Sequence, residues 1–222
     1  MTKTVAVTKA ITSLIDVETK LDLHRAQQDD FFPEVREDLP SLTEEEKKTL
    51  DRLKARYEYH RYYGPLAEGA VNLLLISPLL ELAGFYEPPF QIRAEESVAL
   101  QIEVGDEILN GRIDFLIVHH QLWVVVVESK RSTTDLELAI PQTLTYMLAA
   151  VEGCTSASPS NHKPLYGLIT TGGLFCFLKL SAQGHRQYDF SDTFSLLPRQ
   201  NKLFEVLKIL KKMSQLIQNR VC

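Results

Sequence analysis

The apolar residues of this chain form strand-like runs in its middle and helix-like stretches toward both ends. Two strongly apolar runs, Ile113 to Val118 and Leu122 to Val127, flank the polar tripeptide His119-His120-Gln121. Their β-branched and aromatic content, with a short polar break between them, predicts a β-hairpin. With the turn centred near His120, Asp114 is expected opposite Val126 and diagonal to Glu128.

Charged residues occupy one end of this otherwise apolar hairpin. Asp114 stands near the start of the first run, and the second run ends in Glu128-Ser129-Lys130. A buried charge without a partner is costly, so these groups must be paired, bind a cation or be wet. Two carboxylates and a lysine at a strand end suit a hard cation such as Mg²⁺, which prefers oxygen ligands. A surface ion pair at a hairpin end explains the hairpin pattern equally well.

Further strands are predicted on both sides of the hairpin. Phe90 to Arg93 and Val98 to Val104 have strand character, and the second is expected to turn through Gly105-Asp106 into the hairpin. Downstream, Leu165 to Thr170 and Leu174 to Leu180 are joined by Thr171-Gly172-Gly173, a strong turn signal, and a short run near residues 186–190 extends the set.

The first third of the chain predicts two helices with a connector at about residues 28–40. Residues 8–27 have apolar positions at near-helical spacing. The second helix begins at Ser41 or Thr43, each followed three residues later by a glutamate, and it carries basic residues late. A solvated charged helix is the favoured interpretation of this segment over a phosphate-contacting surface.

A leucine-rich helix is expected from Pro65 to Gly84, with a kink at Pro78. Glu68 lies on its first turns, where the positive end of the helix stabilises a negative side chain. This stabilisation explains the residue without any functional role.

Another helix follows Thr133 and Thr134, with an irregular start because of Pro141. Gln142 and Tyr146 share one face of it, and by pattern alone they are a boundary glutamine and a packed tyrosine. The last helix, about Leu203 to Gln218, is amphipathic, and packing on the core is favoured over dimerisation.

Composition narrows the function classes. A chain of 222 residues is expected to form one domain, and no apolar run approaches the length that crosses a membrane. The N-terminus lacks the apolar core of a signal peptide, and the three cysteines are scattered, which favours a reducing cytoplasm. A net charge of -5 argues against coating nucleic acid through bulk positive charge. No phosphate loop, dinucleotide turn, GxSxG elbow or HExxH motif occurs, and the six histidines have no ligand spacing.

Four short motifs, in order, resemble one known family. The D…E-x-K core of the PD-(D/E)XK nuclease superfamily resembles Asp114 followed by the strand that ends in Glu128-Ser129-Lys130. The Q-x-x-x-Y element of the RecB-like branch of that superfamily resembles Gln142 and Tyr146 on the next helix. The segment EGAVNLLLISPLLELAGFY is similar to the first helix of the nuclease domain in type I restriction enzyme R subunits. That likeness makes Glu68 a site candidate.

The resemblance implies an α/β fold with a restriction-endonuclease-like mixed central β-sheet flanked by helices, extra N-terminal helices and a C-terminal amphipathic helix. Residues 1–62 would be a helical N-terminal extension, 63–190 the nuclease core and 191–222 the C-terminal helix of a single domain.

It also implies a site that hydrolyses phosphodiester bonds of DNA with Mg²⁺, or with Mn²⁺ in its place. Asp114, Glu128, the Ser129 carbonyl and Glu68 would hold the metal, and Lys130 would orient the attacking water. Gln142 and Tyr146 would support the site or touch DNA.

Two departures from the family's pattern are visible. Ile113 replaces the proline of the family name, and the chain has no helicase motor motifs, so it is not a complete motor subunit. A separate helicase or restriction–modification subunits are therefore expected as partners together with DNA, no membrane is expected, and a homodimer is left open. The first hypothesis is a metal-dependent DNA endonuclease or nuclease domain of restriction type. The alternative is an inactive module of the same fold that binds DNA or a protein partner.

Overall fold

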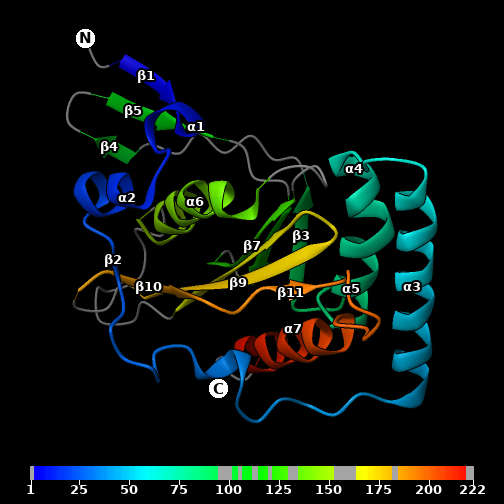
Figure 1. The fold of residues 1–222 in the computed structure, drawn as a ribbon. Helices are drawn as coiled ribbons and strands as arrows, with labels where there is room; N and C mark the ends of the chain where they lie inside the picture. Colours follow the sequence, from blue (N-terminus) through cyan, green and yellow to red (C-terminus); the bar gives the residue numbers. More distant parts are fainter. Residues whose placement is uncertain are drawn as a thin grey trace.

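A mixed β-sheet with helices on both faces forms the centre of the molecule (Figure 1). The computed structural model describes residues 3–94, 102–104, 107–111, 115–119, 122–129, 135–152, 164–181 and 185–218. The strand order is β2-β10-β9-β8-β7-β6-β3, and β11 pairs with β9. The strands are β2 (His24–Arg25), β3 (Phe90–Ala94), β6 (Phe115–His119), β7 (Leu122–Ser129), β8 (Leu165–Thr170), β9 (Leu174–Ser181), β10 (Gln187–Phe190) and β11 (Phe194–Ser195).

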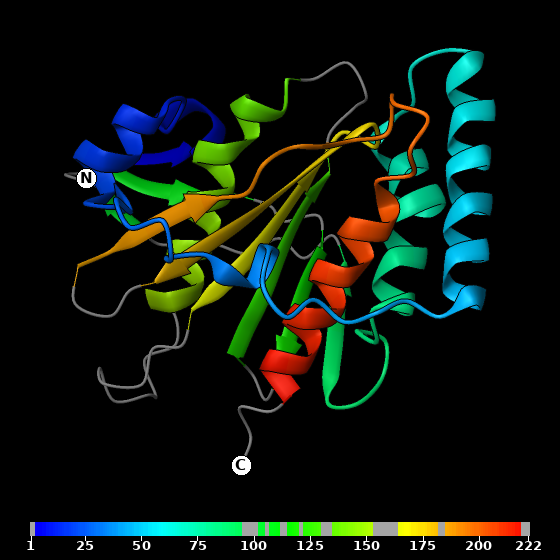
Figure 2. The ribbon, with the colours of Figure 1, turned by 60° about the horizontal axis from the view of Figure 1, so that its bottom comes forward.

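Helices cover the sheet in two groups with separate cores. One core gathers residues of α1, α2 and α6, and the other gathers residues of α3, α4, α5 and α7 (Figure 2). The helices are α1 (Val7–Ala10), α2 (Leu14–Leu21), η1 (Pro33–Val35), α3 (Glu44–Tyr62), α4 (Glu68–Val71), η2 (Asn72–Ile76), α5 (Ser77–Leu82), η3 (Leu136–Ala139), α6 (Ile140–Glu152) and α7 (Leu203–Gln218). The predicted mixed sheet flanked by helices, with extra N-terminal helices and an amphipathic C-terminal helix, is confirmed.

Strand β8 is the buried centre of the sheet. It runs parallel to β7 and antiparallel to β9, and all six of its residues are buried. Its side chains alternate between the two cores, with Tyr166 and Leu168 on one side and Leu165 and Ile169 on the other. A strand covered on both faces reads as a continuous apolar run, which is why the sequence pattern found it.

Gly167 permits the close approach of α6 to this strand. A Cβ atom at this position would lie 2.8 Å from Met147 Sδ and 3.3 Å from Leu178 Cβ. Glycine in a strand interior normally weakens the strand, so its presence here reflects the closeness of the neighbouring helix.

The hairpin forms as expected, but its predicted register is wrong. Val126 pairs with Leu116 rather than with Asp114. The register shifts between Ile117 and Val118 at a β-bulge, so that Val124 has no Cα partner on β6. A bulge adds one residue to one strand, which a pattern of continuous apolar residues does not reveal.

Three other predictions about elements need correction. The single helix over residues 8–27 is divided, because the Ser13 and Asp16 side chains form a capping box that begins α2, and Asp22 (φ 49°) ends it. The leucine-rich helix begins at Glu68 instead of Pro65, and its irregularity is the π-helical turn η2, which precedes Pro78.

The third correction concerns the strand before the hairpin. β4 (Ile102–Val104) does not lead straight into it but pairs with β5 (Glu107–Asn110) in a separate sheet. β1 (Lys3–Ala6) completes that sheet by pairing parallel to β5. Neither β1 nor β5 was predicted, because both are short and their pairing depends on residues about a hundred positions apart.

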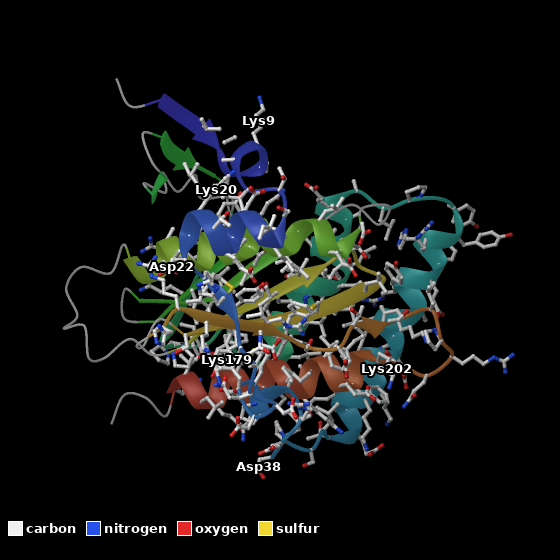
Figure 3. All side chains as sticks on the ribbon, turned by 60° about the vertical axis from the view of Figure 1, so that its left-hand side comes forward. Lys9, Lys20, Asp22, Asp38, Lys179 and Lys202 are labelled. Carbon is white, nitrogen blue, oxygen red and sulfur yellow. The ribbon has the colours of Figure 1, made fainter. Side chains whose placement is uncertain are left out.

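The connector before α3 is held to the sheet by a partly buried lysine. Lys179 Nζ donates to Glu34 Oε1 at 2.7 Å and to the Phe31 carbonyl at 2.8 Å, and the Tyr166 hydroxyl donates to the same carboxylate. Figure 3 shows Lys179 on the side of the sheet that faces α7. Because each of these buried polar atoms has a partner, the connector can lie against the core without a desolvation penalty left unmet.

Polar contacts fix the N-terminal end of helix α3. The predicted capping box is present with Thr43 as the N-cap, and Glu46 closes it. Glu46 also accepts a hydrogen bond from Lys211 Nζ on α7 at 2.5 Å. Burial by itself would raise the pKa of Glu46, but Lys211 and Thr43 together hold it below its ordinary value of 4.5. None of the helices in the described ranges is both long and apolar enough to cross a membrane.

We expect Gly167→Val to reduce the free energy of unfolding by about 2 kcal/mol, because the added methyl groups overpack the interface between α6 and β8. Gly69→Ala is the matched control, since no atom lies within 4 Å of its added Cβ and alanine favours a helix. Urea unfolding of both variants measures the difference. Equal stability of the two would show that the interface tolerates a side chain.

The ion pair of Glu46 predicts a pH dependence. A carboxyl with a lowered pKa in the folded state contributes stability above its ordinary pKa, and this contribution is lost as the pH falls. Glu46→Gln should therefore lower the free energy of unfolding by about 1 to 2 kcal/mol at pH 7. The difference from the wild type should shrink below about pH 4.5 in urea titrations at several pH values. A difference that is constant down to pH 3 would contradict it.

Candidate functional site

The acidic end of the hairpin coincides with the carboxyl ends of two parallel strands. In the backbone, Glu128 is paired with Ile169 and Ser129 with Thr170, at the ends of β7 and β8. On the other side of β7, Phe115 is paired with Val127. Asp114 is the residue before Phe115 in the chain, and Lys130 follows Ser129. Asp114 and Lys130 lie outside the described residues.

The turn after β8 brings helix α4 to the same end of the sheet. Gly172 has φ +80°, and a Cβ there would lie 3.0 Å from Val71 Cγ2 and 3.1 Å from Tyr57 Cε2. The turn is stabilised by Thr170 Oγ1, which accepts a hydrogen bond from the Gly172 N–H. Only glycine combines this positive φ with so close a neighbour. The last residues of β7 and β8 therefore lie beside the short helix that Glu68 begins (Figure 1).

Glu68 is exposed at this end of the sheet. It is the first residue of α4, and no described residue forms a hydrogen bond or an ion pair with its side chain. The sequence alone allowed either a helix-end acid or a site residue. An exposed carboxylate at the helix N-terminus remains compatible with both.

Asn72 is a polar residue of this region that the sequence analysis missed. It lies one turn after Glu68, because its N–H donates to the Glu68 carbonyl. Its Oδ1 is buried and has no hydrogen-bond partner among the described residues. An unsatisfied buried acceptor is uncommon, and a π-helical turn such as η2, which Asn72 begins, often marks a functional site. The i, i+4 spacing of Glu68 and Asn72 was the available signal.

Gln142 and Tyr146 lie on α6, as predicted. Tyr146 is buried, with 3% of its surface exposed, and Gln142 is partly buried. The Tyr146 ring packs directly against Gly111, where an added Cβ would overlap Cε1 and lie 2.9 Å from the hydroxyl oxygen. Gly111 is three residues before Asp114 in the chain. The ring of Tyr146 thus fixes the backbone just upstream of β6.

The described residues alone do not assemble the whole predicted constellation. Among them, no group of three or more histidine, cysteine, aspartate or glutamate side chains has the geometry of a metal site. The structure brings the backbone of Glu128 and Ser129 to the end of the sheet where α4 begins. The part that Asp114, Lys130 and the side chains of Glu128 and Ser129 take in the site remains a prediction.

The fold and the site together define a class, namely an α/β protein with a mixed sheet and an acidic residue, Glu128, at the carboxyl end of a central strand. The chain belongs to the PD-(D/E)XK nuclease superfamily, whose model matches residues 9–219. This match confirms the resemblance inferred from the motifs.

Two further comparisons are more limited. A solved fragment assigned as an HsdR subunit of a type I restriction enzyme from Vibrio vulnificus YJ016 is similar with 17% sequence identity and a TM-score of 0.39. The alignment covers 67% of this chain and 26% of that one, so the chain spans about a quarter of the neighbour's length. A search of curated proteins finds no match.

The contact between Gly111 and Tyr146 predicts an energetic coupling. Gly111→Ala should lower the free energy of unfolding by about 1 to 3 kcal/mol, because the methyl group displaces the ring. The same change in a Tyr146→Leu background should cost less, since leucine leaves more room. A double-mutant cycle by urea unfolding measures the coupling between the two positions. Additive effects would contradict the contact.

Proposed function

We propose that this protein is a metal-dependent DNA endonuclease, or the nuclease domain of a restriction-type enzyme, that hydrolyses phosphodiester bonds. The observation that carries the proposal is the superfamily match over residues 9–219, which includes all the motif positions. The backbone supports it, because Glu128 and Ser129 end a central strand beside α4 and its exposed Glu68.

The proposed metal site uses oxygen donors. Asp114, Glu128 and the Ser129 carbonyl would hold Mg²⁺, or Mn²⁺ in its place, and Glu68 would complete the shell through water. Carboxylates and carbonyls are the donors that hard cations prefer. Asn72 Oδ1, one turn after Glu68, would add an oxygen that has no hydrogen-bond donor among the described residues. The donor set therefore fits the ion.

The residues around the cation have separate roles in the proposed hydrolysis. A bound divalent cation supplies charge stabilisation for the scissile phosphate and lowers the pKa of a coordinated water. Lys130 would orient or polarise the attacking water. Gln142 and Tyr146 would keep α6 and the start of β6 in place or touch the DNA backbone.

The remaining parts of the proposal rest on sequence. On the grounds given above, we propose a single domain divided into residues 1–62, 63–190 and 191–222. We also propose separate helicase or restriction–modification subunits as partners, and a cytoplasmic location. A homodimer is an open alternative. An inactive module that binds DNA or a protein partner is the second candidate function, because a fold is compatible with loss of cutting.

The purified protein is expected to cut or nick DNA with Mg²⁺ or Mn²⁺ and to lose this activity in EDTA. Asp114→Ala, Glu128→Gln and Lys130→Ala should each abolish cutting, at least about a hundredfold, while the thermal unfolding transition is retained. Gel assays on supercoiled, linear and single-stranded DNA measure the activity. Cutting in EDTA, or cutting by the Lys130→Ala variant, would defeat the proposed chemistry.

Glu68→Gln tests the proposed part of Glu68 in the metal shell. Its matched control is Glu81→Gln, since both are exposed glutamates of the α4 to α5 segment. Glu68→Gln should reduce the rate at limiting Mg²⁺ and Glu81→Gln should not. A chain that binds DNA without cutting under any metal or DNA form would support the binding module instead.

A further inference from the structure

Helix α3 has a stripe of basic and aromatic side chains along its outer face. Residues spaced three or four apart share one face of a helix, and all members of this set are exposed. The α3 stripe comprises Lys48, Arg52, Arg56, Tyr59, His60 and Tyr63. At 1.5 Å per residue it extends over roughly 22 Å, which is long enough to follow several nucleotides.

The aromatic end of the stripe is unusually exposed. Tyr59 is 61% exposed, Tyr63 is 73% exposed, and the adjacent Tyr62 is 85% exposed. These rings contact one another and His60 edge to face, with centroids 5.3 to 5.4 Å apart. A solvated charged helix, the interpretation that the sequence favoured, has no need of clustered exposed aromatic rings. Most of the surface of each tyrosine is therefore open to a partner.

The acidic residues of α3 are engaged elsewhere or only weakly engaged with the stripe. Glu58 pairs with Lys54 at 3.6 Å, and Asp51 accepts a hydrogen bond from Asn201. Glu45 is 3.8 Å from Arg52, but both side chains are more than 60% exposed, and such a pair contributes little. Positive charge therefore dominates the stripe in a chain whose net charge is -5. That charge is complementary to phosphate.

The helix behind the stripe is a rigid support. On its buried face, Lys54 Nζ donates to the carbonyls of Pro198, Arg199 and Gln200 at 2.6, 3.0 and 3.3 Å. Leu50, Leu53 and Tyr57 are buried in the core on this side. A surface held in this way can bind without first being ordered.

The aromatic end of the stripe lies at the same end of the molecule as the candidate site. Tyr57, on the last turns of α3, approaches the turn after β8, where an added Cβ at Gly173 would lie 2.8 Å from its hydroxyl oxygen. Tyr63 is five residues before Glu68 in the chain, and the end of α3 lies beside α4 (Figure 1). A strand that leaves the site in this direction meets the aromatic rings first and the basic residues next.

We propose that the α3 stripe binds single-stranded DNA that extends from the candidate nuclease site, with its bases stacked on Tyr59 and Tyr63 and its phosphates on Arg52 and Arg56. Paired bases in a duplex present only their edges, whereas stacking on an aromatic side chain needs an unpaired base. The aromatic rings therefore favour a single strand, a tail or a fork over a continuous duplex. The proposal rests on the proposed function in taking DNA as the substrate.

Fluorescence anisotropy tests the binding of DNA by the α3 stripe. A labelled single-stranded oligonucleotide is compared with the corresponding duplex, in EDTA so that binding is measured without cutting. Tyr59→Ala and Tyr63→Ala should each weaken single-strand binding about tenfold and duplex binding much less. Arg52→Gln with Arg56→Gln should weaken both and make the slope of log affinity against log salt shallower by about 1.4.

The control is Lys9→Gln with Arg199→Gln, which removes the same charge from exposed positions outside the stripe, with Lys9 on α1, apart from α3 (Figure 3). It should bind the single strand within twofold of the wild type. Single-strand binding that is unchanged in the tyrosine variants, or equally weakened in the control, would overturn the proposal.

Cutting assays on the same variants separate this inference from the proposed function. Binding of the single strand through the stripe by a protein that never cuts would support the stripe and contradict the nuclease. Normal cutting of tailed and forked DNA by variants with normal binding would overturn the stripe and leave the nuclease intact.

Discussion

The parallel pairing of β7 with β8, buried under α6, is the constraint on which the rest of the structure depends. β8 has no solvent-facing side, so its position is set by packing on both faces. Gly167 lets α6 approach so closely that no side chain fits between them. Once β8 is held there, its parallel hydrogen bonds fix where β7 ends. The end that carries Glu128 and Ser129 is thereby placed at one defined edge of the sheet.

The turn after β8 transmits this placement to the helices. Gly172 packs against Val71 and Tyr57, so both α4 and α3 are positioned relative to the end of the sheet. Two lysines then fasten the outer parts: the buried Lys54 holds the segment before α7, and the partly buried Lys179 holds the connector before α3. A buried ammonium group requires partners, and each of these has several. Among the described residues, Asn72 Oδ1 and Glu205 Oε2 are the buried side-chain atoms without a hydrogen-bond partner, and Asn72 is the one beside α4.

This arrangement gives the candidate site a rigid support. That support consists of strand ends and short helices, on which functional groups keep their geometry. The backbone of Glu128, near the end of β7, lies at the same end of the sheet as α4, which begins with Glu68. The exposed aromatic end of α3 adds a surface whose chemistry suits unpaired bases. Because of its location, DNA with a single-stranded part would be held next to the candidate site.

The sequence by itself determined the superfamily, the hairpin, the buried strands β8 and β9, the capped start of α3 and the amphipathic α7. These features are encoded locally, in apolar periodicity, capping residues and turn residues, so a single segment suffices to read them. Asp114, Glu128 and Lys130 were predicted as site residues in the same way, because charge at the end of an apolar strand is conspicuous.

The tertiary structure decided what depends on pairing between distant segments. The bulge in the hairpin, the small sheet of β1, β4 and β5, and the proximity of Val71 to Gly172 have no local signal. The role of α3 changed for the same reason. Its sequence indicated only a charged helix, whereas packing fixed which face is buried and left the arginines and tyrosines together on the other.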